Sequence, residues 1–345
     1  MSTMTAAVLV EPGRFEIERV PLPAAGPDDV LIKVAYCGIC GTDSHIFDGG
    51  FMRHRLPLTP GHEFSSTSAA VGSAVSHVRL GQKVVVDINH GCGHCYFCRR
   101  NEVMSCPSVE QIGIDRAGGF ASHVVVPGRL VIAAPHEADM RLLALTEPVA
   151  CVVRSARKSG AGFARSVLVL GAGPIGNLHV QMMRLVGAAP IVVADRSPAR
   201  AALALKAGAD AVVSNMGDLD DTVRRMTGGR GVDLAIESVG LKELYAAALG
   251  LIRSGGQIAV FGLAHEGDTL SLPLLPAVLR EYGLKGSVAG MGEDMHDALT
   301  LLTHGRFDVE PFTRAVYPLE RIQEAFDTLR DRPGDLKTLI ALPDN

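Results

Sequence analysis

The chain has 345 residues, 47% of them hydrophobic and 20% charged, which fits two domains of an ordinary globular protein. Its formal net charge is −4, and no basic run or basic-aromatic stripe occurs, which excludes nucleic acid and anionic membrane as expected partners. Residues 1–14 lack the basic head and apolar core of a signal peptide, and no long uncharged apolar run follows. We therefore expect a cytoplasmic protein.

The first third of the chain predicts a compact β-rich domain. Residues 6–10, 15–20, 30–35, 84–87 and 124–126 are short apolar or alternating segments, and Gly and Pro separate them. Many short strands joined by turns are typical of such a domain and not of a parallel sheet.

Within this region, two neighbouring segments carry side chains that bind zinc. Cys40 offers sulfur, His62 offers nitrogen and Glu63 offers oxygen, and a catalytic zinc site leaves one position open for water or substrate. Thr42 lies two residues after Cys40, so its hydroxyl can lie beside the open position, and His45 is near enough to pass a proton onward. The sequence therefore predicts a catalytic metal site here. Taken singly, each of these residues is more often structural.

A second cysteine cluster follows at residues 90–108. Cys92, Cys95, Cys98 and Cys106 have the spacing Cys-x2-Cys-x2-Cys-x7-Cys, which can surround one tetrahedral zinc ion with no room for substrate. An iron–sulfur cluster is the alternative, although ferredoxin spacing requires a fourth cysteine three residues after the third. The odd total of seven cysteines argues against a disulfide framework.

From about residue 149 the pattern changes to alternating strands and helices. Residues 166–170 form an apolar segment, and it is followed at once by the glycine-rich stretch Gly171, Ala172, Gly173, Pro174, Ile175 and Gly176. A helix-like run, a strand at 191–194 and Asp195 come next, which is the full context of a dinucleotide fingerprint. Asp195 should bind the adenosine ribose and favour NAD over NADP, although Arg196 could accommodate a 2′-phosphate.

Later segments continue the alternation. Residues 232–236 and 257–261 are expected strands, 244–252 an expected helix, and Gly255-Gly256 an expected turn. Val239, Gly262 and Leu263 follow strand ends, where a doubly wound sheet holds a dinucleotide.

Together, the Cys40 and His62 segments, the four-cysteine lobe and the fingerprint resemble the zinc-dependent medium-chain dehydrogenase family, which includes alcohol, sorbitol and threonine dehydrogenases. The resemblance runs through essentially the whole chain. It implies an α/β fold with a GroES-like catalytic domain (residues 1–148 and 287–345) and a Rossmann-type, doubly wound parallel-sheet domain that binds NAD (residues 149–286). It also implies two zinc ions per chain, one catalytic and one structural.

Several residue roles rest on this resemblance alone. Glu147 matches the carboxylate that faces the catalytic zinc in the polyol branch, so either Glu63 or Glu147 could complete the metal site. Arg200 matches a basic residue near the ribose, and Lys337 matches one near the pyrophosphate. The proton path from Thr42 to His45 belongs to the mechanism that the resemblance implies.

The expected reaction is the oxidation of a secondary alcohol (a polyol, sugar alcohol or sugar acid) to a ketone by hydride transfer. L-threonine 3-dehydrogenase and butanediol-type activities are the alternatives within the family. Arg53 and Arg55 either belong to a solvated rim or bind an anionic substrate. A non-catalytic NAD-binding regulator and a zinc-free quinone reductase are the remaining classes. The expected partners are a small alcohol and further copies of the chain, as a homotetramer or homodimer.

Overall fold

The computed structural model describes residues 2–329 and 334–343, which separate into two compact units. The first unit contains residues 1–150, 289–305 and 312–345, and the second contains residues 151–288 and 306–311. Both boundaries lie two residues later than expected: the first follows residue 150 instead of 148, and the second follows residue 288 instead of 286. Residues 306–311 also group with the second unit, where Gln181 exchanges two hydrogen bonds with the backbone of Asp308. Among the described residues, every helix is too short or too polar to span a bilayer.

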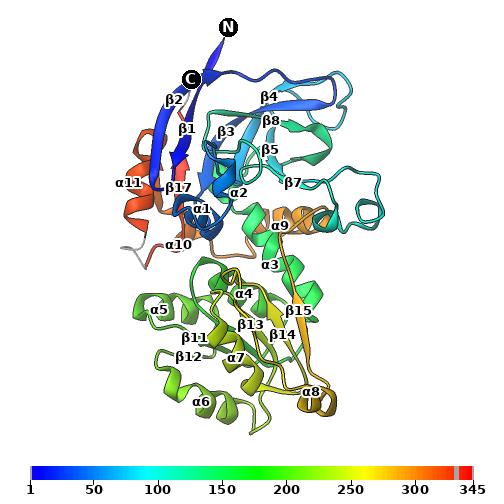
Figure 1. Cartoon of the computed structure of the whole chain (residues 1–345), viewed down its shortest axis with the longest axis vertical. Helices are drawn as coiled ribbons and strands as arrows, with labels where there is room; N and C mark the ends of the chain where they lie inside the picture. Colours follow the sequence, from blue (N-terminus) through cyan, green and yellow to red (C-terminus); the bar gives the residue numbers. More distant parts are fainter. Residues whose placement is uncertain (1, 330–333, 344–345) are drawn as a thin grey trace. The chain divides into compact units, whose positions relative to one another are not determined.

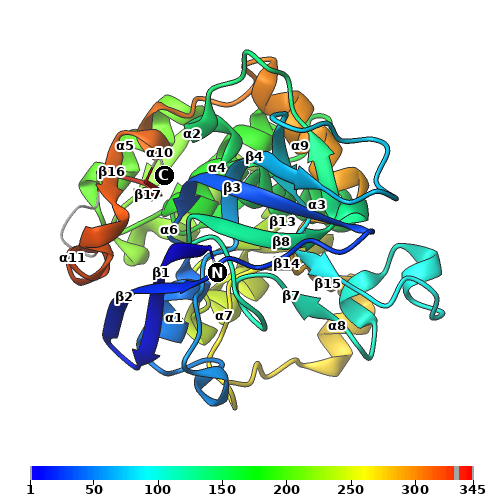
Figure 2. The ribbon, with the colours of Figure 1, turned by 90° about the horizontal axis from the view of Figure 1, so that it is seen from above.

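The first unit is built around a mainly antiparallel sheet (Figures 1 and 2). Its strand order is β16-β17-β3-β4-β5-β9, and β8 pairs with β3. The strands of this unit are β1 (Thr3–Glu11), β2 (Arg14–Pro21), β3 (Asp29–Gly38), β4 (Glu63–Val71), β5 (Lys83–Val86), β6 (Asn89–His90), β7 (Glu110–Gln111), β8 (His123–Pro127), β9 (Val131–Ala133), β16 (Ala315–Pro318) and β17 (Thr338–Ala341).

Helices complete this unit. They are α1 (Gly41–Phe47), α2 (Met140–Leu143), α9 (Glu293–Thr303) and α11 (Ile322–Asp327), while α3 (Thr146–Ser159) and α10 (Glu310–Thr313) each contain a boundary between the units. Helix α1 is anchored by Phe47, whose ring stacks on Phe15 at 5.7 Å and lies 4.9 Å from Phe326. These contacts fix the helix that carries Thr42 and His45.

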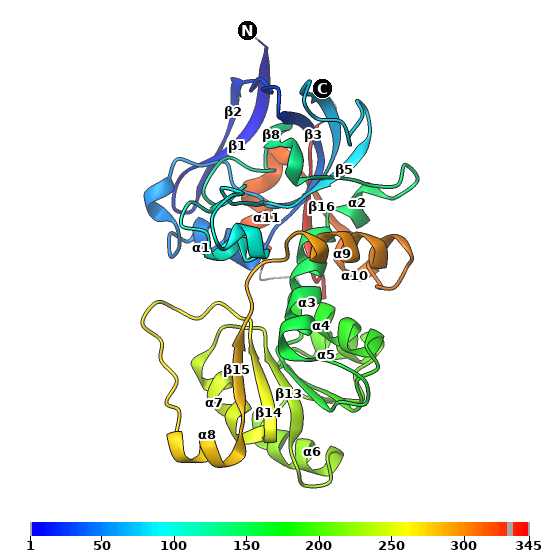
Figure 3. The same cartoon turned by 90° about the vertical axis from the view of Figure 1, so that its right-hand side faces the viewer.

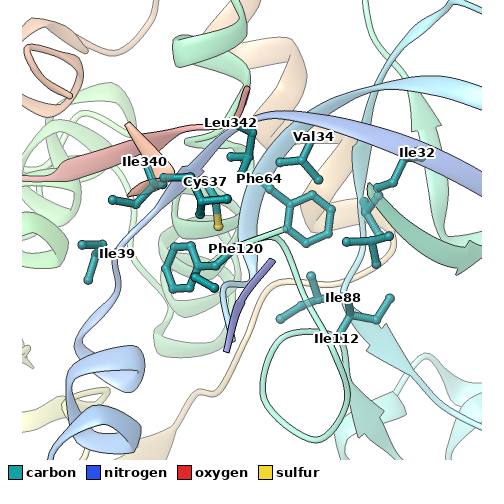
Figure 4. Close-up of a cluster of buried hydrophobic side chains, with 14 of the residues drawn as sticks. Ile32, Val34, Cys37, Ile39, Phe64, Ile88, Ile112, Phe120, Ile340 and Leu342 are labelled. Carbon is teal, nitrogen blue, oxygen red and sulfur yellow. The ribbon is translucent and has the colours of Figure 1, made fainter. Parts of the chain in front are cut away.

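The core of the first unit packs alternate side chains of its strands against each other. Figure 4 shows Cys37 among Phe64, Phe120 and Ile340, and all four side chains are buried. Burial raises the pKa of the Cys37 thiol, so this cysteine is a small core residue and not a reactive group.

The second unit is a six-stranded parallel sheet with the order β12-β11-β10-β13-β14-β15 (Figures 1 and 3). Its strands are β10 (Val167–Leu170), β11 (Ile191–Ala194), β12 (Ala211–Val213), β13 (Val232–Glu237), β14 (Ile252–Val260) and β15 (Gly283–Gly286). Its helices are α4 (Pro174–Leu185), α5 (Pro198–Ala207), α6 (Leu219–Met226), α7 (Lys242–Leu251) and α8 (Leu274–Arg280). The expected doubly wound α/β fold is confirmed.

The expected turn at Gly255-Gly256 differs in the structure. Strand β14 already begins at Ile252 and pairs with Val232, and the pairing resumes between Gln257 and Leu234 after a register shift. Gly255 has a φ of +73° in this irregular segment. The two glycines therefore form a bulge inside a longer strand.

Candidate metal centres and cofactor site

The candidate catalytic metal site joins the end of β3, the start of α1 and the start of β4. Cys40, His62 and Glu63 each offer a ligand atom, and these atoms lie within 4.8 Å of one another. His62 and Glu63 are buried. Burial lowers the pKa of His62, but Asp43 and the Cys40 thiolate outweigh this effect and raise it. A cation would neutralise this concentration of negative charge.

Asp43 ties the two motif segments together. Its carboxylate accepts hydrogen bonds from the backbone N–H of Cys40 at 2.8 Å and of Gly61 at 3.3 Å. Its Oδ1 also lies 3.4 Å from Nδ1 of His62, close enough for an ion pair, although no described group makes an aligned hydrogen bond to that nitrogen. A carboxylate behind the imidazole is the usual support of a metal-bound histidine.

Glu63 has one engaged and one unengaged oxygen. Its Oε2 is ion-paired with the buried ammonium of Lys337, which also donates to the Ile39 carbonyl at 3.3 Å. Its Oε1 is buried and has no hydrogen-bond partner among the described residues. Burial lowers the pKa of Lys337, but Glu63, Cys40 and Glu147 raise it by a larger amount. The orphaned oxygen beside a thiol and an imidazole fits a zinc ion.

Glu147 and Lys337 were predicted from the resemblance alone. Glu147 is buried at the start of α3 and is not one of the three clustered donors, so its role as a ligand stays a prediction. The Lys337 ammonium is paired with Glu63, and its contact with the pyrophosphate also stays a prediction.

Thr42 and His45 lie on α1, three residues apart and therefore on one face of the helix. The Thr42 hydroxyl is 3.9 Å from Sγ of Cys40, and His45 is exposed to solvent.

The four-cysteine lobe forms a second donor cluster. The sulfurs of Cys92, Cys95, Cys98 and Cys106 lie within 4.8 Å of one another, and no disulfide joins these cysteines. Backbone N–H groups point at the sulfurs, for example from Cys95 to Cys92 at 3.4 Å. The N–H groups of His94 and Cys95 lower the pKa of the Cys92 thiol to about 6. Four converging cysteine sulfurs fit a closed tetrahedral zinc site.

The glycine-rich loop between β10 and α4 has the geometry that its motif predicts. Gly171 has a φ of +95°, and a Cβ at Gly176 would lie 1.9 Å from the Gly171 carbonyl oxygen. Helix and strand could not pack this closely with larger residues. The space above Gly173 is open, with only an Arg200 nitrogen 3.9 Å from its Cβ position. Backbone N–H groups at this helix start can therefore be reached by a pyrophosphate.

A cleft of about 490 Å³ adjoins this loop. Its lining includes Asp195, Arg196, Arg200, Val239, Leu241 and Glu243. Asp195 Oδ2 accepts the N–H of Ala172 at 2.7 Å and Oδ1 accepts that of Ser197 at 2.8 Å, so the carboxylate fixes the glycine-rich loop and retains further acceptor positions.

Sequence reasoning assigned no role to Glu237 or Glu243. Both are acids in the second unit, and Glu243 lines the cleft. Glu237 has a recognisable signal in the sequence. It is an acid at the end of an apolar strand, and a glycine, Gly240, lies between it and the helix that begins at Lys242. Glu243 has no such signal, because its position in the cleft depends on how α7 packs.

A GroES-like unit with two zinc-donor clusters and a parallel-sheet unit with a dinucleotide loop define the class of zinc-binding dehydrogenases. Two family models agree: the alcohol dehydrogenase GroES-like domain matches residues 26–136, and the zinc-binding dehydrogenase model matches residues 174–304. The chain belongs to this zinc-dependent medium-chain alcohol dehydrogenase family and is an oxidoreductase.

Its relatives are named for several different enzyme activities. The chain is 33% identical over 344 residues to D-arabitol-phosphate dehydrogenase of Enterococcus avium, covering 98% of this chain and 97% of the relative. It is 32% identical to L-threonine 3-dehydrogenase of a Chelativorans strain, covering 91% and 92%. A solved structure from Sinorhizobium meliloti, assigned as a zinc-binding dehydrogenase and bound to NADP, matches with a TM-score of 0.90 and 31% identity, covering 99% of this chain and all of that one.

Proposed function

We propose that this protein oxidises a secondary alcohol, of the polyol, sugar-alcohol or sugar-acid class, to a ketone with zinc and NAD. The observation that carries the proposal is the convergence of Cys40, His62 and Glu63, with the orphaned Glu63 oxygen among them. Zinc supplies Lewis-acid polarisation of an alcohol oxygen, and NAD supplies the hydride acceptor.

The residues of this chain would bind the two zinc ions and transfer the proton of the substrate. Cys40 and His62 would hold the catalytic zinc together with Glu63 or Glu147, and the four-cysteine lobe would hold the structural zinc. The Thr42 hydroxyl, close to Cys40, would accept the proton of the substrate alcohol. His45, exposed on the same face of α1, would pass that proton to water.

The preference for NAD rests on the charges of the cleft. Asp195 and Glu243 both line it, and two carboxylates would repel a 2′-phosphate. Arg196 and Arg200 line it as well and favour NADP, the ligand of the Sinorhizobium meliloti neighbour. A comparison of kcat/KM with the two cofactors tests the preference, and a higher value with NADP would contradict it.

The substrate class rests on three features. Glu147 matches the polyol branch, and a relative at 33% identity is a D-arabitol-phosphate dehydrogenase. Arg53 and Arg55 form an exposed 3₁₀ turn (Arg53–Arg55), which suits a phosphate or carboxylate on the substrate, although Arg55 is also 3.7 Å from Asp115. L-Threonine is the second candidate, because a relative at 32% identity carries that activity.

A substrate panel with NAD, read as NADH absorbance, tests the function. It should contain polyols, sugar acids, sugar-alcohol phosphates, threonine, butanediol and simple alcohols. We expect the highest kcat/KM with a sugar alcohol or its phosphate. A higher value with threonine would replace the substrate assignment. No turnover of any alcohol by zinc-loaded protein would leave the non-catalytic NAD-binding regulator.

We also propose that the protein is cytoplasmic and forms a homodimer or homotetramer. Helix α8 exposes Leu274, Leu275, Val278 and Leu279, each at least 69% accessible, beside the edge strand β15 (Figure 3). A second copy would cover such an apolar surface. Light scattering should give a multimer, and Leu275→Glu should shift it towards monomer. A monomeric wild type would contradict the proposal.

A further inference from the structure

Glu237 is a buried carboxylate at the point where the parallel sheet reverses its strand order. It ends β13 and lies in register with Leu170 of β10 and Val260 of β14. The first strand of the sheet, β10, is followed outward by β11 and β12 on one side and by β13 to β15 on the other. Ligands of open parallel sheets bind at the carboxyl edge beside such a reversal.

The carboxylate of Glu237 is enclosed by backbone N–H groups of the loop that follows. Its Oε1 accepts hydrogen bonds from Val239 and Gly240, both at 3.0 Å, and its Oε2 accepts one from Gly240 at 2.9 Å. The N–H of Leu241 adds a longer contact at 3.4 Å. Hydrogen bonds to an ionised acceptor are about twice as strong as neutral ones, so the carboxylate fixes this loop.

Glu237 also holds the next loop, which follows β14. Its backbone carbonyl accepts the N–H of Gly262 at 2.9 Å. A Cβ at Gly262 would lie 2.5 Å from Glu237 Oε2 and 2.2 Å from the nitrogen of Gly240, so the two loops are in direct contact. The hydroxyl of Tyr245 also donates to the Gly262 carbonyl, at 2.7 Å.

These two loops present apolar side chains to solvent. Val239 is 48% exposed and Leu263 is 56% exposed, although both are large and apolar. Val239 reaches over the glycine-rich loop, because its Cγ2 would lie 2.4 Å from a Cβ at Gly171, and it lines the cleft beside Asp195. Exposed apolar residues beside a cleft with convergent polar groups are typical of ligand contacts.

We propose that Glu237 is a positioning residue for the dinucleotide. Its carboxylate locks the loops after β13 and β14 so that Val239 and Leu263 are held ready for the cofactor before it arrives. This inference rests on the proposed function, because it takes the ligand of the cleft to be NAD. Fixing the loops beforehand removes part of the ordering cost of binding.

The test is the affinity of the full-length, zinc-loaded protein for NADH, measured by calorimetry without alcohol. In Glu237→Gln an amide NH2 replaces one acceptor and opposes the backbone N–H groups. We expect the Kd for NADH to rise roughly 10- to 100-fold. Hydrogen exchange should also quicken at residues 238–241 and 262–264 and should stay unchanged at the four-cysteine lobe.

Asp233→Asn is the matched control. Asp233 lies at the opposite end of the same strand and accepts hydrogen bonds from Ser166 and Arg253, so its loss also weakens β13. We expect this variant to keep the wild-type Kd. An unchanged Kd in Glu237→Gln, or an equal rise in both variants, would overturn the proposal.

Tyr245→Phe provides a second variant if Glu237→Gln does not fold. It removes the hydroxyl that ties the loop after β14 and keeps the ring, and we expect a Kd roughly 3- to 10-fold higher. Wild-type affinity in this variant would count against the locked-loop account. Failure of the wild type to bind NADH at all would instead contradict the proposed function, so the two failures can be told apart.

Discussion

His179 on α4 is a fully buried histidine whose two ring nitrogens have no hydrogen-bond partner among the described residues. Its ring meets Phe261 edge to face at 4.8 Å. Burial alone lowers its pKa from 6.5 to about 3, so the ring is neutral in the folded protein. In the unfolded chain, the His179 imidazole binds a second ring proton below about pH 6.5. The free energy of unfolding therefore carries no penalty from this histidine above pH 6.5, and it decreases as the pH falls from 6.5 towards 3.

His179→Leu should test this effect. The substitution removes two unsatisfied buried nitrogens, so we expect equal or higher thermal stability at pH 7. It should also reduce the loss of stability between pH 7 and pH 5, which for this group is on the order of 2 kcal/mol. Thermal melts at the two pH values measure both effects. His296→Leu, at an exposed position, is the control, and an equal change in both variants would contradict the account.

The buried pair of Lys337 and Glu63 predicts a large effect on stability. Lys337→Met leaves the Glu63 charge without its cation, which should cost about 3–5 kcal/mol in the free energy of unfolding. The double variant Lys337→Met with Glu63→Gln should recover part of that loss, because no unpaired charge remains. Denaturant titrations of the wild type, Lys337→Met, Glu63→Gln and the double variant measure these changes. A double variant as unstable as the sum of the single ones would show that the pair is not coupled.

The proposed proton path predicts different effects for its two residues. Thr42→Ala removes the hydroxyl proposed to accept the proton of the substrate alcohol and should lower kcat roughly 100-fold or more. His45→Ala should slow turnover mainly at low pH, because hydroxide in solution takes over the proton at high pH. Profiles of kcat against pH distinguish the two, and Thr42→Ser should restore much of the rate. An unchanged kcat in Thr42→Ala would discard the path.

At the residue scale, the sequence predicted which side chains cluster better than it predicted their surroundings. Cys40, His62 and Glu63 could be found because zinc chemistry restricts the residue types. The pairing of Glu63 with Lys337 joins positions 274 residues apart, which local spacing does not encode. Glu237 was visible as an acid at a strand end, but its set of N–H partners depends on how the following loop folds.

Among the structural elements, the four-cysteine lobe offers the clearest test. Cys98→Ser should lower the zinc content by one ion per chain, because three thiolates no longer close a tetrahedral shell. Hydrogen exchange at residues 90–108 should quicken, while the Cys40 site keeps its metal. Elemental analysis of the purified variant measures the loss. Iron in place of zinc in the wild type would favour the iron–sulfur alternative.

Strands and helices with strong local signals were predicted closely. The predicted strand at 191–194 matches β11, and the helix-like run expected after the glycine-rich stretch matches α4. The turn predicted at Gly255-Gly256 was wrong. Glycines occur in bulges as well as in turns, and here they form a bulge inside β14. Helix α8 was not predicted, because its exposed leucines give no amphipathic pattern with a polar face.

For the whole molecule, the order of motifs indicated both units, because each motif requires its own fold: clustered metal donors on an antiparallel scaffold, and a glycine-rich loop on a parallel sheet. The assignment of residues 306–311 to the second unit could not be predicted, because it depends on the distant contact with Gln181. The proposed association of copies depends likewise on a surface that local motifs do not describe.

We propose that Cys40 and His62 hold a catalytic zinc ion that binds the oxygen of the alcohol substrate. Elemental analysis of freshly purified wild type and of Cys40→Ser tests it most directly. We expect two zinc ions per chain in the wild type and one in the variant, which should retain NADH binding but lose alcohol oxidation. A wild type with zinc only in the four-cysteine lobe, or a Cys40→Ser variant with undiminished zinc and activity, would contradict the account.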